Sequence, residues 1–265
     1  MRDKVTLQGL FGRVLYPLPF ALCPLTFALA LLASAQAPEP PKPPLNGQAL
    51  PGVVELLAVG PGEHAQNSVC EATGFLVNEE GYLVTNAHVV EELRSCLSKI
   101  PGGKILAKLP TPGETFARGF TCDVVGIEEV HDLAVLKMLR PLSADAPAPP
   151  AYASLDPREV REGTAVTVTG HPAFAWQPFT QSGQVVWRGT LRLGEKSVET
   201  TGVLVFNIPL RPGNSGSPVY LESGGVVGVV VQRDETRRDH AVAIAIRFVI
   251  DLLERCGVKW HAQAP

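Results

Sequence analysis

The sequence has few aromatic residues and lacks the clusters that mark nucleic-acid-binding and zinc-binding proteins. Aromatic side chains make up 6% of its 265 residues, and no block of lysine and arginine stands out in a chain of net charge −3. Proteins that hold nucleic acid by charge carry such blocks, so we expect no nucleic-acid partner. No Cys-x-x-Cys pair or clustered cysteine and histidine is present. We therefore expect no metal and no cofactor.

The chain is instead rich in residues that punctuate short strands. It contains 25 glycines and 24 prolines, and 45% of its residues are apolar. This composition favours many short strands over long helices. The length suits one domain of about 200 residues or two small lobes.

The first 35 residues have the pattern of an export signal. Arg2, Lys4 and Arg13 precede an uncharged stretch over residues 14–32, and the small residues 33–35 form a cleavage site. Prolines interrupt the stretch and argue against a regular membrane-spanning helix, but an uncleaved membrane anchor is the alternative. We predict an exported protein in the periplasm or outside the cell, and a membrane tether through this segment if it is not cleaved.

A proline-rich segment over residues 36–51 links this signal to the folded part. Five prolines occur between Pro38 and Pro44, which predicts an extended polyproline stretch. It is either a spacer that holds the domain away from a membrane or wall, or a disordered lead-in.

Export makes disulfides available to the four cysteines that follow the signal. Three pairings are open, and the first choice is Cys70 with Cys96, because these residues flank one strand-turn-strand unit. The loop that they close would contribute roughly 3–4 kcal/mol in the chain-entropy model.

The sequence after residue 51 predicts two series of strands with a connection between them. The first series, over residues 52–139, predicts strands at 53–59, 70–77, 82–85, 105–109, 115–127 and 133–138, with a helix at 89–97. A connection over residues 140–157 follows. The second series, over residues 158–246, predicts strands at 164–169, 179–192, 198–210, 218–221, 226–232 and 241–246, and a helix at 247–257. Two similar β-barrels with chemistry between them fit this pattern.

One loop in the second series has the composition of an acyl-transfer site. Residues 211–218 read Arg-Pro-Gly-Asn-Ser-Gly-Ser-Pro, so two glycines bracket Ser215. Such a loop can hold a hydroxyl near converging main-chain N–H groups, although the same residues also make ordinary turns. A serine nucleophile needs an imidazole base and an acid that orients it.

His88 and Asp132 are the candidate base and acid. His88 lies where a strand ends and a helix begins, and Asp132 starts the apolar strand 133–137. His171 is interpreted instead as a surface or turn residue, like His64, His240 and His261. Glu128, Glu129 and His131 are interpreted as a solvated turn beside Asp132.

These segments resemble the bacterial trypsin-like serine proteases of the HtrA/Deg type. The histidine segment 73–90, the aspartate segment 131–137 and the serine segment 212–218 are similar to those of that family, as is the strand at 182–185. The resemblance covers residues 52–258 and implies an all-β, chymotrypsin-like fold of two six-stranded antiparallel β-barrels with a C-terminal helix.

The resemblance also implies a mechanism and its residues. Ser215 attacks the peptide carbonyl, His88 moves the proton, Asp132 orients His88, and the N–H groups of Gly213 and Ser215 form the oxyanion hole. This implies an exported serine endopeptidase that acts on polypeptides through an acyl-enzyme intermediate. The alternatives are a protease-fold binding or scaffold protein with an idle triad, and a serine esterase. The oligomeric state is left open.

Two departures from the family limit what carries over. Ser217 stands where these proteases usually have glycine, and its hydroxymethyl group either perturbs the loop or is tolerated. Few residues follow the predicted C-terminal helix, so we expect a stand-alone protease domain without the PDZ domain of HtrA proteins.

The substrate-binding residues are predicted from their position relative to Ser215. None of them is acidic, which argues against a preference for Lys or Arg and favours a small or medium apolar residue. Gln232 and Arg233 are also expected to pair with the substrate backbone. The predicted residues are Pro209, Leu210, Val229, Val231, Gln232 and Arg233.

Overall fold

The computed structural model describes residues 52–61, 71–109, 118–141, 152–172, 178–193, 198–233 and 237–264. The predicted signal, the proline-rich segment and Cys70 lie outside these residues. In the described part of the chain, neither helix has the length and apolarity needed to cross a membrane.

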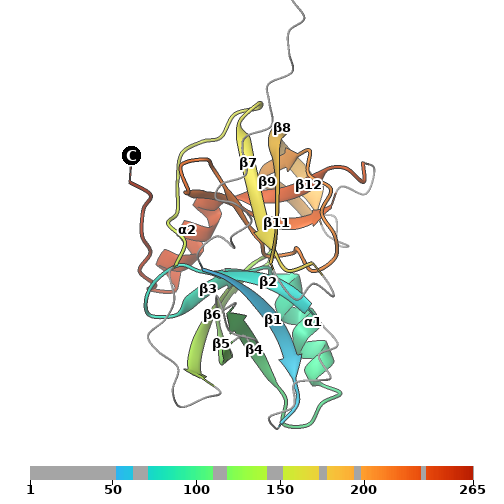
Figure 1. Ribbon diagram of the computed structural model, residues 1–265, viewed down its shortest axis with the longest axis vertical. Helices are drawn as coiled ribbons and strands as arrows, with labels where there is room; N and C mark the ends of the chain where they lie inside the picture. Colours follow the sequence, from blue (N-terminus) through green and yellow to red (C-terminus); the bar gives the residue numbers. More distant parts are fainter. Residues whose placement is uncertain are drawn as a thin grey trace, which may run out of the picture. The chain divides into compact units, whose positions relative to one another are not determined.

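The first half of the described chain closes into an antiparallel six-stranded barrel. Neighbouring strands follow the order β1-β2-β3-β6-β5-β4, and every pair is antiparallel. Helix α1 packs beside this barrel, against β1, β4, β5 and β6 (Figure 1). The bounds are β1 Val53–Val59, β2 Glu71–Leu76, β3 Tyr82–Thr85, α1 Ala87–Leu97, β4 Lys104–Leu109, β5 Arg118–Glu128 and β6 Leu133–Pro141.

The second half repeats this topology. Its strands follow the order β7-β8-β9-β12-β11-β10, which is the order of the first barrel with each number raised by six. The prediction of two six-stranded antiparallel barrels is therefore confirmed. The bounds are β7 Ala165–Gly170, β8 Phe179–Leu193, β9 Val198–Phe206, β10 Pro218–Tyr220, β11 Val226–Arg233, β12 Ala241–Ala245 and α2 Ile246–Arg255.

Apolar side chains fill each barrel and also join the two barrels. Strand β11 shows the division, because Val227 and Val230 belong to the interior cluster of the second barrel. Val229 and Val231 belong to a different cluster, which also contains residues of β2, β3 and β6. Helix α2 adds to this shared cluster and contacts β5 and β6 as well as β11 and β12. Strand β11 thus contributes side chains to two cores, and its register with β10 shifts between Val226 and Gly228.

Several element boundaries differ from the predicted ones by a few residues. Helix α1 begins at Ala87, so His88 lies inside its first turn rather than before it. Strand β9 ends at Phe206, four residues early. The side chain of Asn207 there accepts a hydrogen bond from Gln184 N at 2.7 Å, and Pro209 has no N–H to continue a ladder.

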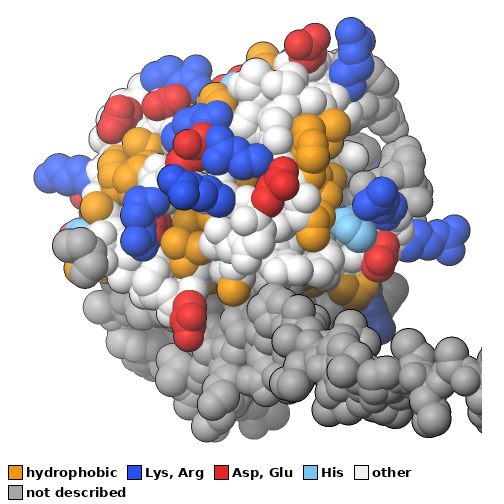
Figure 2. Space-filling model, turned by 90° about the horizontal axis from the view of Figure 1, so that it is seen from above, with side chains coloured by type: hydrophobic (Ala, Val, Ile, Leu, Met, Phe, Trp, Pro, Cys, Tyr) orange, Lys and Arg blue, Asp and Glu red, His pale blue; other side chains and the backbone are white. Residues whose placement is uncertain are grey.

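Charges of both signs are mixed on the described surface (Figure 2), and the described cysteines include both bonded and free thiols. Figure 2 shows basic and acidic side chains interspersed over the described part of the face that it draws. Cys96 is disulfide-bonded, whereas Cys122 and Cys256 are free thiols. The pairing of Cys96 with Cys70 stays a prediction. Burial raises the pKa of the Cys122 thiol to about 12, which keeps this thiol unreactive.

Candidate active site

His88 is held at the start of helix α1 by a carboxylate from another part of the first barrel. Asn86 occupies the N-cap position, but its side chain makes no capping bond to the helix. Instead Asp132 Oδ1 accepts a hydrogen bond from the backbone N of His88 at 2.8 Å. The first N–H groups of a helix have no partner within the helix, and a negative charge at this end is favourable. Asp132 therefore caps the helix that carries His88.

The second oxygen of the same carboxylate binds the imidazole ring. His88 Nδ1 donates to Asp132 Oδ2 at 2.6 Å, which fixes the ring orientation and leaves Nε2 as the free nitrogen. Burial lowers the pKa of His88, but the hydrogen bond and the charge of Asp132 outweigh burial, and the net effect is a raised pKa. The arrangement is that of a base oriented by an acid.

The backbone of Asp132 adopts a conformation that few residues tolerate. Asp132 is the one non-glycine among the described residues with a positive φ, at 56°, and aspartate is among the side chains that accept this region. Asn86 Nδ2 donates to Asp132 O at 3.0 Å. Asn86 does not cap α1 itself, but it binds the carbonyl of Asp132, whose carboxylate supplies the cap.

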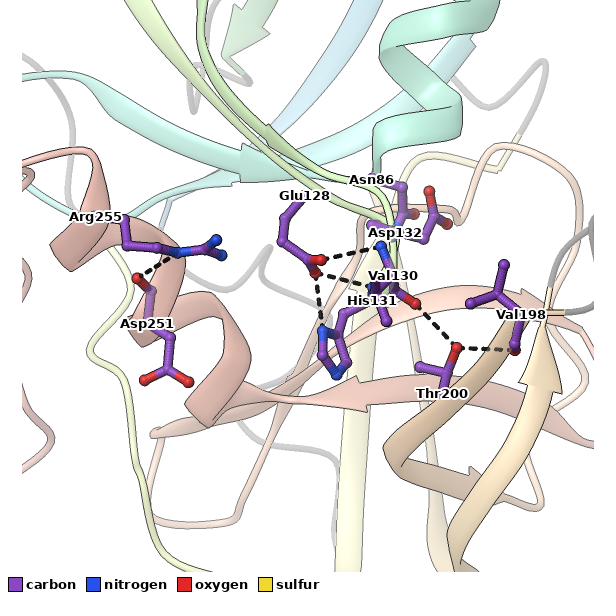
Figure 3. A network of polar contacts seen from close by, with 9 residues as sticks. All are labelled: Asn86, Glu128, Val130, His131, Asp132, Val198, Thr200, Asp251 and Arg255. Carbon is purple, nitrogen blue, oxygen red and sulfur yellow. Dashed lines mark hydrogen bonds and ion pairs between the residues drawn. The ribbon is translucent and has the colours of Figure 1, made fainter.

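The residues before Asp132 form a tightly bonded loop, which we call the aspartate loop (residues 128–132). The carboxylate of Glu128 accepts from Val130 N at 3.0 Å and from the backbone N and Nδ1 of His131 at 2.9 Å each (Figure 3). The His131 ring also stacks on Phe248 of α2 at 3.7 Å between centroids. Residues 129–132 form the predicted turn and Glu129 is exposed. The expected solvation is wrong for Glu128 and His131, whose side chains are only 13% and 16% exposed.

Ser215 lies on a loop built from two successive turns, which we call the serine loop (residues 211–218). Asn214 N donates to Arg211 O at 3.2 Å, and Ser217 N donates to Asn214 O at 3.0 Å. The third residue of each turn is a glycine with positive φ, Gly213 at 92° and Gly216 at 83°. This is the type II arrangement, which requires a residue free to adopt φ > 0 at that place. The glycines on both sides of Ser215 follow from this geometry.

In the described part of the chain, the serine loop has two N–H groups without a partner, and its Ser215 hydroxyl bonds to the backbone of β11. Within the described residues, neither Gly213 N nor Ser215 N donates a hydrogen bond. Ser215 Oγ donates to Val231 O on β11 at 3.2 Å. In the same part of the chain, Ser215 Oγ and His88 share no hydrogen bond. The Ser215 hydroxyl is thus bonded to the backbone of β11 rather than to the imidazole.

The serine loop lies against the strand that leads to His88. A Cβ at Gly216 would overlap Thr73 O of β2 and Thr85 Oγ1 of β3. Thr85 ends the strand that precedes Asn86 and His88. The loop of the second barrel thus approaches the first barrel three residues before the imidazole.

Ser217 is accommodated inside the molecule rather than at its surface. Its side chain is fully buried, and its hydroxyl has no hydrogen-bond partner among the residues that the structure describes. A Cβ at Gly170, the last residue of β7, would overlap Ser217 Oγ and lie 2.6 Å from Asn214 Oδ1. The missing side chain of Gly170 therefore supplies the space that the hydroxymethyl group occupies.

A cavity of about 180 Å³ adjoins Ser215. Leu210 and Gln232 of the predicted substrate-binding residues line it, whereas Pro209 does not. Val229 and Val231 face the core between the barrels, and the side chain of Arg233 lies outside the described set. The lining residues are Leu210, Arg211, Pro212, Asn214, Ser215, Val230 and Gln232.

Thr73 and His171 are parts of the site that the sequence interpretation missed. His171 is 4% exposed, so its interpretation as a surface or turn residue is wrong. Among the described residues, neither of its ring nitrogens has a hydrogen-bond partner. Burial, aided by the charge of Lys108, lowers the pKa of His171 to about 4. Its backbone N donates to Thr73 Oγ1 at 2.8 Å. Thr73 lies within the histidine segment 73–90, but no local sequence pattern predicts its hydrogen bonds to Gly213 and His171.

A comparison with protein families finds a match that includes His88, Asp132 and Ser215. Residues 72–229 match the model of the trypsin-like peptidase domain. A probable periplasmic serine endoprotease of the DegP-like type from Chlamydia trachomatis is 29% identical over 164 residues, which are 62% of this chain and 28% of that protein. A protein of the same name from Halomonas elongata is 27% identical over 166 residues, 63% of this chain and 30% of that protein.

Solved structures agree at the level of the fold. The Rv3671c protease from M. tuberculosis in its active form has a TM-score of 0.58 and 20% sequence identity, covering 81% of this chain and 84% of that one. This chain spans less than a third of the length of the two curated relatives.

Proposed function

The chain belongs to the trypsin-like peptidase domain family, and from that premise we propose that it is a serine endopeptidase with His88, Asp132 and Ser215 as its catalytic triad. The observation that carries this proposal is the double hydrogen bond from His88 to Asp132. A single carboxylate caps the helix of the base and binds its ring, which leaves Nε2 available to take a proton.

The reaction requires Ser215 to exchange one hydrogen-bond partner for another. Its hydroxyl leaves Val231 O and turns to His88 Nε2, which removes the proton as Oγ attacks the peptide carbonyl carbon. The protonated His88 then gives this proton to the departing amine, and an acyl-enzyme remains. Water, deprotonated by His88, hydrolyses the ester and restores the Ser215 hydroxyl.

The N–H groups of Gly213 and Ser215 are the proposed oxyanion donors. The support for this role is that both lack a partner in the described residues and that the φ of 92° at Gly213 is the type II setting of its turn. One such donor contributes roughly a hundredfold to a thousandfold in kcat.

The cavity beside Ser215 suits a small or medium apolar side chain. Leu210, Pro212 and Val230 supply apolar walls, and the described residues of the lining include no carboxylate that would attract a lysine or arginine. We therefore infer polypeptide substrates that are cleaved after residues of the size of alanine, valine or leucine. The names of the periplasmic relatives and the charge pattern of residues 1–35 together support export to the periplasm.

Two measurements on the full-length protein test this proposal. A fluorophosphonate probe should label the wild-type protein and leave Ser215→Ala unlabelled, and a peptide-library digest should show cleavage after apolar residues that Ser215→Ala abolishes with its melting temperature unchanged. Labelling without peptide cleavage would indicate an esterase. A protein that neither labels nor cleaves would be a scaffold with an idle triad. Full peptidase activity in Ser215→Ala would contradict the assignment of the nucleophile.

A further inference from the structure

Two buried threonines bond across the boundary between the barrels, one in each direction. Thr73 belongs to β2 of the first barrel and bonds to the serine loop of the second. Thr200 belongs to β9 of the second barrel and bonds to the aspartate loop of the first. Both residues are fully buried. Each barrel thus contributes one hydroxyl to the loop that carries a reactive side chain of the other barrel.

Thr73 holds the peptide groups next to the proposed oxyanion donors. Its hydroxyl donates to Gly213 O at 2.7 Å and accepts from His171 N at 2.8 Å. Its backbone N donates to Ser215 O at 3.0 Å. These bonds fix the carbonyls of the two residues whose N–H groups are free. A rotation of the serine loop would break a bond on each side of Asn214.

Thr200 holds the aspartate loop from the opposite side. Its hydroxyl donates to Val130 O at 2.9 Å and lies 3.2 Å from Val198 O (Figure 3). Val130 is two residues before Asp132, and its N–H is bound by the Glu128 carboxylate. Both backbone polar groups of Val130 are therefore fixed, one from within its own loop and one from the second barrel.

We propose that Thr73 and Thr200 are reciprocal positioning residues, through which each barrel sets the place of the other barrel's catalytic loop. A catalytic constellation needs to be held within a fraction of an ångström, and hydrogen bonds from buried strands can supply this precision. Other buried threonines of the second barrel bond within it, as Thr169 does to Thr180 at 2.9 Å. The role proposed for Thr73 and Thr200 rests on the proposed peptidase function.

The kinetic test compares variants that lose the hydroxyl with variants that keep it. In the full-length protein, Thr73→Val is expected to lower kcat by about tenfold to a hundredfold with KM little changed, because the oxyanion donors move. Thr200→Val is expected to lower kcat by about tenfold, because Asp132 moves. Thr73→Ser and Thr200→Ser should recover most of the loss. Thr169→Val, which removes a buried hydroxyl that bonds within one barrel, is the matched control and should keep kcat.

The pH profile separates the two threonines. Since Asp132 raises the pKa of His88, a displaced Asp132 lets that pKa fall, and the acid limb of the kcat/KM profile of Thr200→Val should shift to lower pH. Thr73→Val leaves the His88–Asp132 pair intact, so its acid limb should stay in place. If a valine variant does not fold, the alanine variant at the same position replaces it.

A measurement independent of turnover keeps this proposal separate from the proposed function. In amide NMR spectra, Thr73→Val should shift Gly213 and Ser215 but not Asp132, and Thr200→Val should shift Asp132 and His88 but not Gly213. A wild-type protein without hydrolytic activity would overturn the proposed function, and these spectra would still decide the positioning roles. Valine variants with wild-type kcat, or shifts confined to the substituted barrel, would overturn the proposal.

Discussion

The two barrels share one strand order but differ in how completely they have assembled their part of the site. In the first barrel both oxygens of Asp132 are bonded to His88, and Glu128 binds the loop before it. In the second barrel the hydroxyl of Ser215 is bonded to Val231 O, and the N–H groups of Gly213 and Ser215 have no partner in the described chain. Under the proposed function, the first barrel holds its base already oriented, whereas the oxyanion donors of the second barrel have no partner in the described chain.

The difference follows from the local structure of the two loops. The polar groups of the aspartate loop are bonded by Glu128 from within the loop, and by Asn86 and Thr200 from outside it. The serine loop consists of two type II turns, whose glycines free the central N–H groups and let the loop pack against Thr73 and Thr85. Under the proposed function the loop keeps two donors unpaired, which costs stability, and its bonds to Thr73 hold it against the first barrel.

Removal of the charge of Asp132 is expected to have the largest effect, because it weakens the two hydrogen bonds that orient His88. Asparagine tolerates the φ of 56°, so Asp132→Asn should fold, but its single carbonyl oxygen cannot accept both N–H groups of His88. We expect kcat/KM to fall about 10⁴-fold. The pKa of His88 should fall as well, which NMR titration of the imidazole can measure. Asp239→Asn, at an exposed position of the second barrel, is the control, and equal losses in both variants would refute the role of Asp132.

Addition of a methyl group at Gly216 is expected to separate the serine loop from the first barrel. A Cβ there would overlap Thr73 O and Thr85 Oγ1, and φ is 83°. We expect Gly216→Ala to lower kcat/KM by at least about a hundredfold and the free energy of unfolding by more than the roughly 1–2 kcal/mol that positive φ alone costs. Gly224→Ala has a similar φ of 87° with open space around it, so it isolates the backbone cost. Urea unfolding and peptide hydrolysis measure both. Similar losses in the two variants would show that the contact between loop and barrel is unimportant.

The parts of this site that were predictable from the sequence are those that local structure determines. Glycine at 213 and 216 is required by positive φ within four-residue turns, and such a signal is contained in the residues themselves. The order of His88, Asp132 and Ser215 along the chain, with the strands between them, was enough to place them in two barrels. These features depend on short-range patterns or on the resemblance to a family.

The parts that were not predictable depend on contacts between distant residues. Thr73 and Gly213 are 140 positions apart, Thr73 and His171 are 98 apart, and Thr200 and Val130 are 70 apart. A threonine in a strand has the same local pattern whether its hydroxyl bonds within the barrel or across it. Val230 lines the cavity and its neighbours Val229 and Val231 do not, because they belong to the core that the two barrels share.

The buried His171 and the partly exposed His88 are expected to respond to acid in opposite ways. The pKa of His171 is lowered to about 4, so the unfolded chain binds more protons between about pH 6.5 and 4, and stability falls as the pH drops through that range. The loss attributable to His171 reaches about 3 kcal/mol. The raised pKa of His88 contributes stability that is present below the unfolded pKa and is lost as the pH rises through the folded one. Urea unfolding at pH 7 and pH 4 should show a smaller loss in His171→Phe than in the wild type. An unchanged loss would place the acid sensitivity elsewhere.

The smallest expected effect concerns the hydroxyl of Ser217, which the second barrel buries without using. Ser217 Oγ has no partner, whereas the hydroxyl of Ser182 in the same barrel lies 3.0 Å from Thr167 Oγ1. Ser217→Ala removes an unsatisfied polar atom and should leave stability unchanged or raise it by up to about 1 kcal/mol, while Ser182→Ala breaks a bond and should lower it by about 1 kcal/mol. Urea unfolding of both variants, with kcat as a check on the site, makes the comparison. If Ser217→Ala is as destabilised as Ser182→Ala, the hydroxyl of Ser217 stabilises the serine loop. The space left by Gly170 would then not explain why the structure tolerates this hydroxyl.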